Sequence, residues 1–300
     1  MNFPAPFVKN IRDTFGIAGE EWLHGLPFLL RGLCERWDLT ITGHAEDLSY
    51  NFVGYARTNA QKNPVVIKVL CPDGVLDKEL QWLKYYSEVT PAVLAVESDQ
   101  RAFMMQMVSP GSSLKSLVKA GKDGEATSVI AQMIRSLGKE RPAGILPYKH
   151  VRDFLPTLSL LHGKLSSELV LLVAVLYDEL CMTAPRDVLL HGDLHHDNIL
   201  ASADGWKVID PHGYVGDPAF EVGAMISNPL DCYPSGQLLE KILDQRLDIL
   251  YRELAMDPHR ILGWTFCYSM LSAAWSIEDR QEVPENLLQI VRILGSKIAS

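Results

Sequence analysis

Residues 188–212 read VLLHGDLHHDNILASADGWKVIDPH and interrupt a half of the chain that is otherwise rich in helical patterns. The segments NILAS and WKVID are short strand-like runs joined by ADG, a sequence typical of tight turns. A hairpin brings its two outer ends together, so we expect Asn198 to lie beside Asp210. An amide oxygen and a carboxylate side by side are hard ligands that suit Mg²⁺. The stretch therefore predicts a magnesium site at the mouth of a β-hairpin.

Asp193 lies on the loop before this hairpin, five residues ahead of Asn198. From there its carboxylate can accept a proton from an incoming hydroxyl or orient that hydroxyl. The spacing D-x-x-x-x-N, followed by an Asp at a strand end, is that of a kinase catalytic loop. Phosphoryl transfer depends mainly on positioning and on neutralising phosphate charge, and residues of these types supply both.

A transition-metal site is an alternative interpretation of the same stretch, and a purely structural turn is another. The string HGDLHHDN lacks the i, i+4 histidine spacing of helical zinc motifs, and the order of loop, hairpin and Asp fits phosphoryl transfer better. We expect His191 to buttress the loop, as the first residue of an HRD-like triplet, and His195 and His196 to pack or to face solvent. The side chains that could ligate a transition metal are His191, His195, His196, Asp193, Asp197 and Asp210.

The strings HGDLHHDNIL and WKVIDPHGYVGDPAFEVGAM together resemble the aminoglycoside and hydroxyurea phosphotransferase family, in particular its streptomycin 6-kinase branch. The resemblance is highly specific over 191–225, weak near the N-terminus, and extends to AAWSIED at 273–279. It implies a bilobal, protein-kinase-like fold with ATP bound between the lobes. It also implies that the protein phosphorylates a hydroxyl of an antibiotic and so inactivates it.

The resemblance also implies roles for single residues. Asp193 would be the catalytic base, and Asn198 and Asp210 would be the metal ligands. Asp210 is followed by Pro-His-Gly where protein kinases have Phe-Gly, which is typical of the small-molecule branch. Glu221 lies near a predicted helix start, where we expect it to accept backbone N–H groups and brace the catalytic loop. A direct contact between Glu221 and substrate is the alternative.

Lys68 lies in the apolar run PVVIKVL, where an ammonium group is costly to bury without a partner. In a kinase lobe such a lysine contacts the α- and β-phosphates of ATP, and we expect Glu79 on the following helix to pair with it. The phosphate-covering loop departs from G-x-G-x-x-G, because TGHAEDLSYNFVG has only two glycines. Adenine would contact the lobe linker at Gln106, Met107 and Val108.

Trp275, Glu278 and Asp279 end a predicted helix in AAWSIEDR. Acids there suit the guanidinium groups of streptomycin, and a cation could lie over the indole ring. Because acids at a helix C-terminus oppose its macrodipole, a functional reason for them is favoured. An ordinary helix end with a packed Trp is the alternative. Asp217 and His212 are further candidates for contact with substrate.

The first third of the chain has a β pattern that follows a helical opening. Residues 18–37 predict one or two helices, with Pro27 as a break. A helix is predicted over 75–88, with its apolar side chains on one face. Short runs rich in β-branched, aromatic or Met residues predict strands over 39–43, 49–57, 64–70, 92–97 and 101–108.

The pattern becomes helical after Pro110-Gly111, a plausible hinge. The pattern predicts an α+β chain in which a small five-stranded lobe, with one helix beside its sheet, precedes a mostly helical lobe, and the resemblance implies that this bilobal fold is of the protein-kinase type. Residues 1–108 would form the N-terminal, nucleotide-binding lobe, and residues 109–300 the helical lobe with the catalytic loop and the substrate site. Helices of this second lobe are predicted over 114–119, 125–138, 166–181, 236–255, 258–276 and 284–300.

Composition limits the partners of the protein. A net charge of −9 argues against nucleic acid and anionic membranes and suits a cationic small molecule. The five cysteines are odd in number and form no CxxC pair, so reduced thiols in a cytoplasmic enzyme are expected. The chain has neither a signal peptide pattern nor an apolar run of roughly 20 residues. We expect a cytoplasmic monomer or weak homodimer.

Three functions remain open from the residues. The first is an ATP- and Mg²⁺-dependent kinase that phosphorylates a streptomycin-like aminoglycoside and confers resistance. The second is a kinase for hydroxyurea or another small hydroxylated metabolite, which an intact catalytic set cannot separate from the first. The third is a nucleotide-binding pseudokinase that serves as an interaction module. The presence of Lys68, Asp193, Asn198 and Asp210 disfavours this third function.

Overall fold

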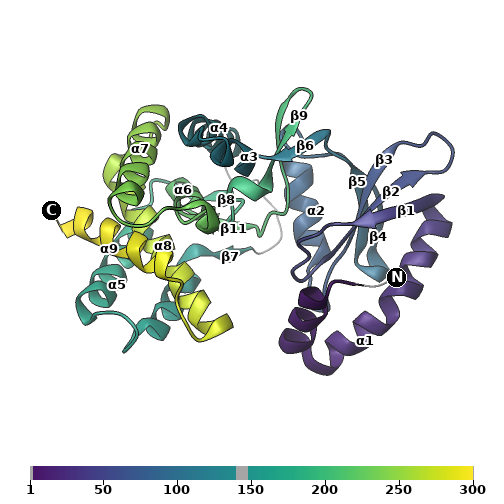
Figure 1. The fold of residues 1–300 in the computed structure, drawn as a ribbon, viewed down its shortest axis with the longest axis horizontal. Helices are drawn as coiled ribbons and strands as arrows, with labels where there is room; N and C mark the ends of the chain where they lie inside the picture. The colour runs from purple at the N-terminus through teal and green to yellow at the C-terminus, as the bar shows by residue number, and fades with distance from the viewer. Residues whose placement is uncertain (1–2, 140–147, 300) are drawn as a thin grey trace. The chain divides into compact units, whose positions relative to one another are not determined.

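The computed structural model describes residues 3–139 and 148–299. The first two residues of the expected N-terminal lobe, residues 140–147 and the last residue of the helix expected over 284–300 lie outside the described residues. The chain divides into two compact units, Met1–Ser109 and Pro110–Ser300, and each is described by itself (Figure 1). Within the described ranges, no helix combines the length and the apolar character needed to cross a membrane.

The first unit is built on a five-stranded antiparallel sheet with the strand order β1-β2-β3-β5-β4. Each predicted strand is present, and so is the predicted helix between the third and fourth strands. The α+β class predicted from the sequence is therefore confirmed. The elements are α1 (Ala5–Trp37), β1 (Leu39–His44), β2 (Phe52–Thr58), β3 (Pro64–Val69), α2 (Leu76–Tyr85), β4 (Val93–Glu97) and β5 (Ala102–Gln106).

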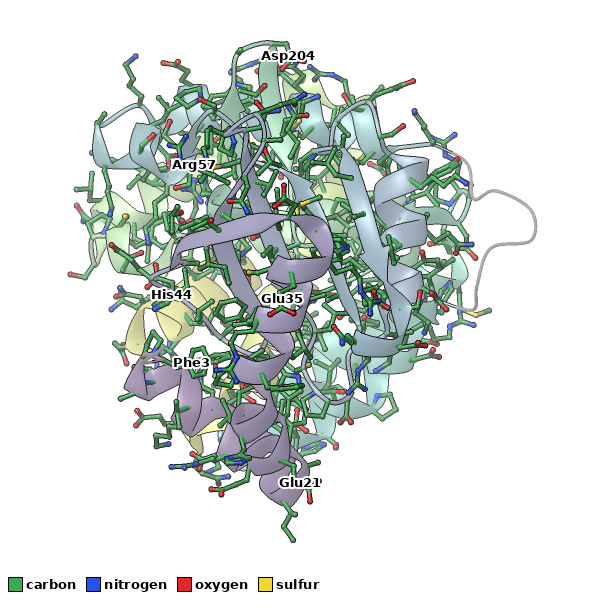
Figure 2. All side chains as sticks on the ribbon, turned by 90° about the vertical axis from the view of Figure 1, so that its right-hand side faces the viewer. Phe3, Glu21, Glu35, His44, Arg57 and Asp204 are labelled. Atoms are coloured by element: carbon green, nitrogen blue, oxygen red, sulfur yellow. The ribbon has the colours of Figure 1, made fainter. Side chains whose placement is uncertain are left out.

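Helix α1 packs on one face of this sheet. Its side chains Leu26 and Leu30 belong to one buried cluster with Phe52 and Ile67 of the strands. Figure 2 shows α1 in front of the sheet, with the exposed Glu21 and Glu35 on it. The long helix therefore closes the apolar face of the sheet and leaves its own charged side chains in solvent.

The predicted helix break at Pro27 is wrong. Pro27 lies inside α1, and the non-helical residue is Gly16, with φ 54° and ψ −127°. A glycine adopts this conformation without the steric penalty of a side chain, so the direction of the chain changes there. The helical segment also begins well before residue 18, where the periodicity placed its start.

The second unit is mainly helical. Every helix predicted after the hinge is present, and the predictions missed α6 and the 3₁₀ helix Val151–Leu161. Helix α8 packs against α5, α6, α7 and α9, so it forms the centre of the unit. The helices are α3 (Lys115–Lys119), α4 (Asp123–Leu137), α5 (Ser167–Met182), α6 (Val222–Ile226), α7 (Gln237–Glu253), α8 (Pro258–Arg280) and α9 (Glu285–Ala299).

Two small sheets carry the loops of the second unit. One has the order β10-β9-β6 and includes the predicted hairpin, in which Ile199 pairs with Val208. Its third strand contains Pro110 and Gly111, the residues predicted as a hinge. Proline is tolerated there because it is the first residue of the strand. The other sheet has the order β7-β11-β8. The strands are β6 (Pro110–Ser113), β7 (Lys149–His150), β8 (Val188–Leu190), β9 (Ile199–Ser202), β10 (Gly205–Val208) and β11 (Tyr214–Gly216).

A buried arginine joins α7 to α4 and to the segment after α6. Arg246 is fully buried, and its guanidinium donates to both carboxylate oxygens of Asp123, at 2.9 and 2.5 Å. It also donates to the carbonyls of Met225 and Asn228, at 2.7 Å each, and to the hydroxyl of Tyr233. A buried charge of this kind is tolerated because nearby acceptors replace its water shell.

We expect Arg246→Leu to lower the free energy of unfolding by about 3 to 5 kcal/mol, because Asp123 and the carbonyls of Met225 and Asn228 lose their partner. Arg252→Leu, at an exposed position of the same helix, is the matched control and should change stability by about 0.5 kcal/mol or less. Urea unfolding followed by circular dichroism measures both. Similar losses in the two variants would contradict this role of Arg246.

Candidate active site

The loop between β8 and the β9–β10 hairpin carries the predicted catalytic base. Gly192 precedes Asp193 and has φ 84°, a backbone conformation that favours glycine. A side chain there would also place its Cβ 2.3 Å from the ring of Tyr214. The loop can therefore pass close to β11 only with glycine at this position, and this passage presents Asp193.

His191 and Glu221 hold the loop from inside the protein. The backbone N–H groups of His191 and Gly192 donate to the two carboxylate oxygens of Glu221, the second at 3.2 Å. The ring of His191 donates from Nε2 to the carbonyl of Ile209 at 2.9 Å and accepts at Nδ1 from the backbone N–H of Asp193 at 3.2 Å. Both side chains thus make the contacts expected of residues that brace the loop.

Burial changes the ionisation of these two bracing residues. It lowers the pKa of His191 to about 4, so the ring is neutral and can accept at Nδ1. Burial also raises the pKa of Glu221 to about 7, while the two backbone N–H donors act in the opposite direction. The carboxylate of Glu221 therefore depends on those donors for its charge.

The side chain of Asp193 is 25% exposed and lies among polar groups. Its Oδ2 lies 3.4 Å from Nε2 of His195 and 3.8 Å from Nε2 of His212. Burial alone would raise the pKa of Asp193, but the hydrogen bond from His195 and the neighbouring histidines lower it well below its usual range. The pKa of His195 is raised: burial lowers it, but the contact with Asp193 outweighs that effect. His195 is thus a neighbour of Asp193, whereas the sequence predicted a packing or solvent role.

Asn198 and Asp210 stand at the two outer ends of the hairpin. The backbone N–H of Ile209 donates to the carbonyl of Asn198 at 3.0 Å, which ties the ends together. The amide nitrogen of Asn198 donates to the carbonyl of Asp193 at 2.9 Å, which leaves its amide oxygen for a cation. Asp210 is exposed and has φ 59°. One amide oxygen and one carboxylate are a donor set that fits Mg²⁺.

The alternative of a transition-metal site finds no support in the geometry. In the part of the chain that the structure describes, no three His, Cys, Asp or Glu side chains are grouped to hold a metal. His196 is fully buried, and neither ring nitrogen has a hydrogen-bond partner among the described residues. Burial lowers the pKa of His196 to about 2, so this histidine packs as a neutral ring.

The prediction that Asp217 contacts substrate is wrong. Asp217 is 1% exposed, and its Oδ1 accepts the backbone N–H of Ala219 at 2.9 Å. Its Oδ2 accepts from Nε1 of Trp264 at 2.7 Å and from the guanidinium of Arg260. With both oxygens used inside the protein, Asp217 instead fastens the short helix that carries Glu221 to α8.

The residues predicted at the end of α8 divide into two groups. Trp275 is half-buried and packs edge-on against Phe154 and Tyr268, with ring centroids 5.5 and 5.7 Å apart. The hydroxyl of Tyr268 contacts Asp193, so Trp275 lies one side chain away from the predicted base. Glu278 and Asp279 are exposed on the last turn of the helix.

Lys68 and Glu79 form a buried ion pair in the first unit. Their side chains are 4% and 10% exposed, and Nζ lies 2.7 Å from Oε1. Lys68 comes from the central strand β3, and Glu79 from α2. A lysine buried in this way is tolerated because the carboxylate of Glu79 replaces part of its lost water shell.

The linker residues lie at the end of β5 in the first unit. Gln106 is exposed and its backbone N–H donates to the carbonyl of Ala92 at 2.9 Å. Met107 and Val108 are half-buried. Both residues follow the last paired residues of β3 and β5, and the backbone N–H of Met107 donates to the carbonyl of Pro64 at 3.5 Å.

Comparison with known proteins places the chain in a family. Residues 55–280 match the family model described as aminoglycoside/hydroxyurea antibiotic resistance kinase. The chain belongs to this family. The resemblance inferred from residues 191–225 is therefore confirmed, and the protein is a kinase of this family.

Individual relatives agree with the family assignment. The streptomycin 6-kinase of Streptomyces glaucescens is 26% identical over 291 residues, which cover 93% of this chain and 92% of that protein. The hydroxyurea phosphotransferase of Kitasatospora aureofaciens is 25% identical over 302 residues, covering 98% and 86%. Among solved structures, a choline/ethanolamine kinase family protein from Mesorhizobium loti has a TM-score of 0.60 at 12% identity over 87% of each chain. This likeness confirms the predicted kinase-like fold.

The sequence did not identify Tyr268, although one signal was present. Trp264, Tyr268 and Trp275 recur at spacings of four and seven residues, which place them on one face of a helix. Such an aromatic stripe usually marks a core face, and only its polar atoms distinguish it here. All three side chains lie near the loop or its supports.

We expect His196→Leu to remove an acid-sensitive part of the stability. The folded-state pKa of His196 is lowered to about 2, so its contribution is complete above the unfolded pKa near 6.5 and is lost as the pH falls below it. Between about pH 7.5 and about pH 5, the wild type should lose about 2 kcal/mol relative to the variant. Urea unfolding at both pH values measures this. The exposed control His162→Leu should leave the pH slope unchanged, and parallel slopes for wild type and His196→Leu would refute the assignment.

Proposed function

We propose that this protein is an ATP- and Mg²⁺-dependent phosphotransferase that phosphorylates a hydroxyl of a streptomycin-type aminoglycoside and so confers resistance in the cytoplasm. The observation that carries the proposal is the placement of the Asp193 carboxylate, held on a braced loop beside Asn198 and the hairpin end that bears Asp210. The family match and the streptomycin 6-kinase relative support it.

Asp193 is the proposed base of the transfer. Its carboxylate orients the acceptor hydroxyl and takes the proton as the oxygen forms its bond to the γ-phosphorus. A lowered pKa is compatible with this role, because the loose transition state removes the proton late and needs orientation first. His191 and Glu221 act through the loop and do not contact the reacting atoms.

The nucleotide and the metal each have proposed contacts. Lys68, held by Glu79, contacts the α- and β-phosphates, and the segment Gln106–Val108 contacts adenine. Asn198 and Asp210 hold Mg²⁺ through an amide oxygen and a carboxylate. Bound there, the metal ion neutralises charge on the phosphates.

The substrate assignment rests on charge and on the relatives. The net charge of −9 and the exposed Glu278 and Asp279 suit a cationic aminoglycoside. Trp275, beside the contact partner of Asp193, offers an aromatic face to a cation. We propose that a single chain or a weak homodimer is the active form.

A second candidate is a kinase for hydroxyurea. It is favoured by the hydroxyurea phosphotransferase relative, whose match spans 98% of this chain. The geometry around Asp193 suits any small hydroxyl acceptor, whereas the net charge, the acidic residues at the end of α8 and Trp275 favour the cationic one. The pseudokinase alternative has no support, because the proposed base and metal ligands are all present.

The test is ATP consumption by the purified protein with Mg²⁺ and a panel of streptomycin, other aminoglycosides and hydroxyurea. We expect turnover with streptomycin and phosphate incorporation detected by mass spectrometry. Asp193→Asn should lower kcat by about 100- to 10,000-fold while ATP affinity stays within about twofold, because the base is lost and the nucleotide contacts are not.

The panel separates the candidates. Turnover with hydroxyurea alone would favour the second candidate, a hydroxyurea kinase, over the aminoglycoside kinase. Near wild-type turnover in Asp193→Asn would contradict the base assignment. ATP binding without phosphate transfer to any acceptor would contradict the proposed substrate class.

We expect Asp210→Ala to raise the Mg²⁺ concentration at half-maximal rate by at least about 10-fold. The variant loses the carboxylate ligand and keeps only the amide oxygen of Asn198. Asp204→Ala is the matched control, since Asp204 is an exposed acid at the turn of the same hairpin (Figure 2). Rates measured over a Mg²⁺ titration at fixed ATP give the comparison. An unchanged titration in Asp210→Ala would place the metal elsewhere.

A further inference from the structure

A tyrosine from the central helix reaches the predicted base. The hydroxyl of Tyr268 lies 3.3 Å from Oδ1 of Asp193 and 3.3 Å from the carbonyl oxygen of Gly192. Tyr268 comes from α8, 75 residues further along the chain than Asp193. The contact therefore belongs to the tertiary fold and not to the local geometry of the loop.

The position of the Tyr268 ring is fixed by packing. Its side chain is 4% exposed and lies edge-on to Phe220 and Trp275, with centroids 5.3 and 5.7 Å away. Gly223 of α6 makes room for it, because a Cβ at that position would lie 2.2 Å from the Cβ of Tyr268. A ring enclosed on these sides has no alternative place for its hydroxyl.

The hydroxyl acts as a donor. Its pKa is raised well above the ordinary value, chiefly by burial and then by the charge of Asp193, so the phenol keeps its proton. The two atoms within reach, a carbonyl oxygen and a carboxylate oxygen, are both acceptors. A hydrogen bond to an ionised carboxylate is stronger than one between neutral groups.

The two carboxylate oxygens of Asp193 thus have different surroundings. Oδ1 is on the side of the buried tyrosine, and Oδ2 is on the side of His195 and the exposed His212. A donor on Oδ1 restricts rotation of the carboxylate and keeps Oδ2 toward the exposed His212.

We infer that Tyr268 is a positioning residue for phosphoryl transfer: it holds Asp193 through Oδ1 so that Oδ2 accepts the proton of the substrate hydroxyl. This inference rests on the proposed function of Asp193. In the transfer, the hydroxyl oxygen bonds to the γ-phosphorus, the bond from that phosphorus to the β,γ-bridging oxygen breaks, and the proton passes to Oδ2. Tyr268 keeps its own proton throughout.

The test compares Tyr268→Phe with Tyr177→Phe. Both changes remove one buried hydroxyl and keep the ring, and the hydroxyl of Tyr177 donates to the carbonyl of Val151 at 2.7 Å, away from the loop. We expect Tyr268→Phe to lower kcat about 10-fold with KM for ATP and acceptor within about twofold, since a hydrogen bond to a charged group is lost. Tyr177→Phe should lower the Tm and leave kcat unchanged.

A double variant separates positioning from a structural effect. In the Asp193→Asn background, Tyr268→Phe should lower the residual rate less than about twofold, because the carboxylate it holds is gone. An equal loss in both backgrounds, or an unchanged kcat in the single variant, would overturn the inference.

A crystal structure of Tyr268→Phe gives a readout that is independent of the acceptor. We expect the Asp193 carboxylate to rotate or to occupy two conformers, against one in the wild type. A single unchanged conformer would overturn the inference, even if no acceptor in the panel were phosphorylated. If the protein were inactive with every acceptor but Asp193 still rotated in Tyr268→Phe, the proposed function would be rejected and the positioning contact would stand.

Discussion

The second unit depends on one interaction: two consecutive backbone N–H groups donate to the carboxylate of Glu221. It fixes the backbone at His191 and Gly192, and these residues set the direction in which Asp193 leaves the loop. Asp217 caps the N-terminus of the short helix Pro218–Glu221 and accepts a hydrogen bond from Trp264 of α8. One line of buried polar contacts therefore runs from the central helix to the loop that carries Asp193, the proposed base.

This line of contacts is stable only if each charge finds its partners. A buried carboxylate costs several kcal/mol unless hydrogen bonds and opposite charge offset its lost hydration. Arg260 and the indole N–H of Trp264 offset the lost hydration of Asp217, and backbone N–H donors alone offset that of Glu221. Burial raises the pKa of Glu221, and the two backbone N–H donors act against that effect.

Much of the site was predictable because its spacing is local. The hairpin between Asn198 and Asp210 follows from its turn residues, and the pairing of Lys68 with Glu79 follows from the need of a strand lysine for a counter-charge. The buried role of Asp217 was not predictable, because its partner Arg260 lies 43 residues away and the sequence around Asp217 contains no signal of this pairing. The contact of Tyr268 with Asp193 was missed for the same reason, and its aromatic stripe looks like ordinary core.

Two glycines described above bear on how the enzyme can diversify. Any missense change of a glycine codon adds a Cβ, and at Gly192 and Gly223 that atom would meet Tyr214 or Tyr268 at little more than 2 Å. We therefore expect glycine to be retained at both positions, whichever substrate is under selection. Half-buried or exposed positions such as Trp275 and Glu278, the proposed substrate contacts, carry no such steric limit, so sequence change is expected there before it is expected beside the Asp193 loop.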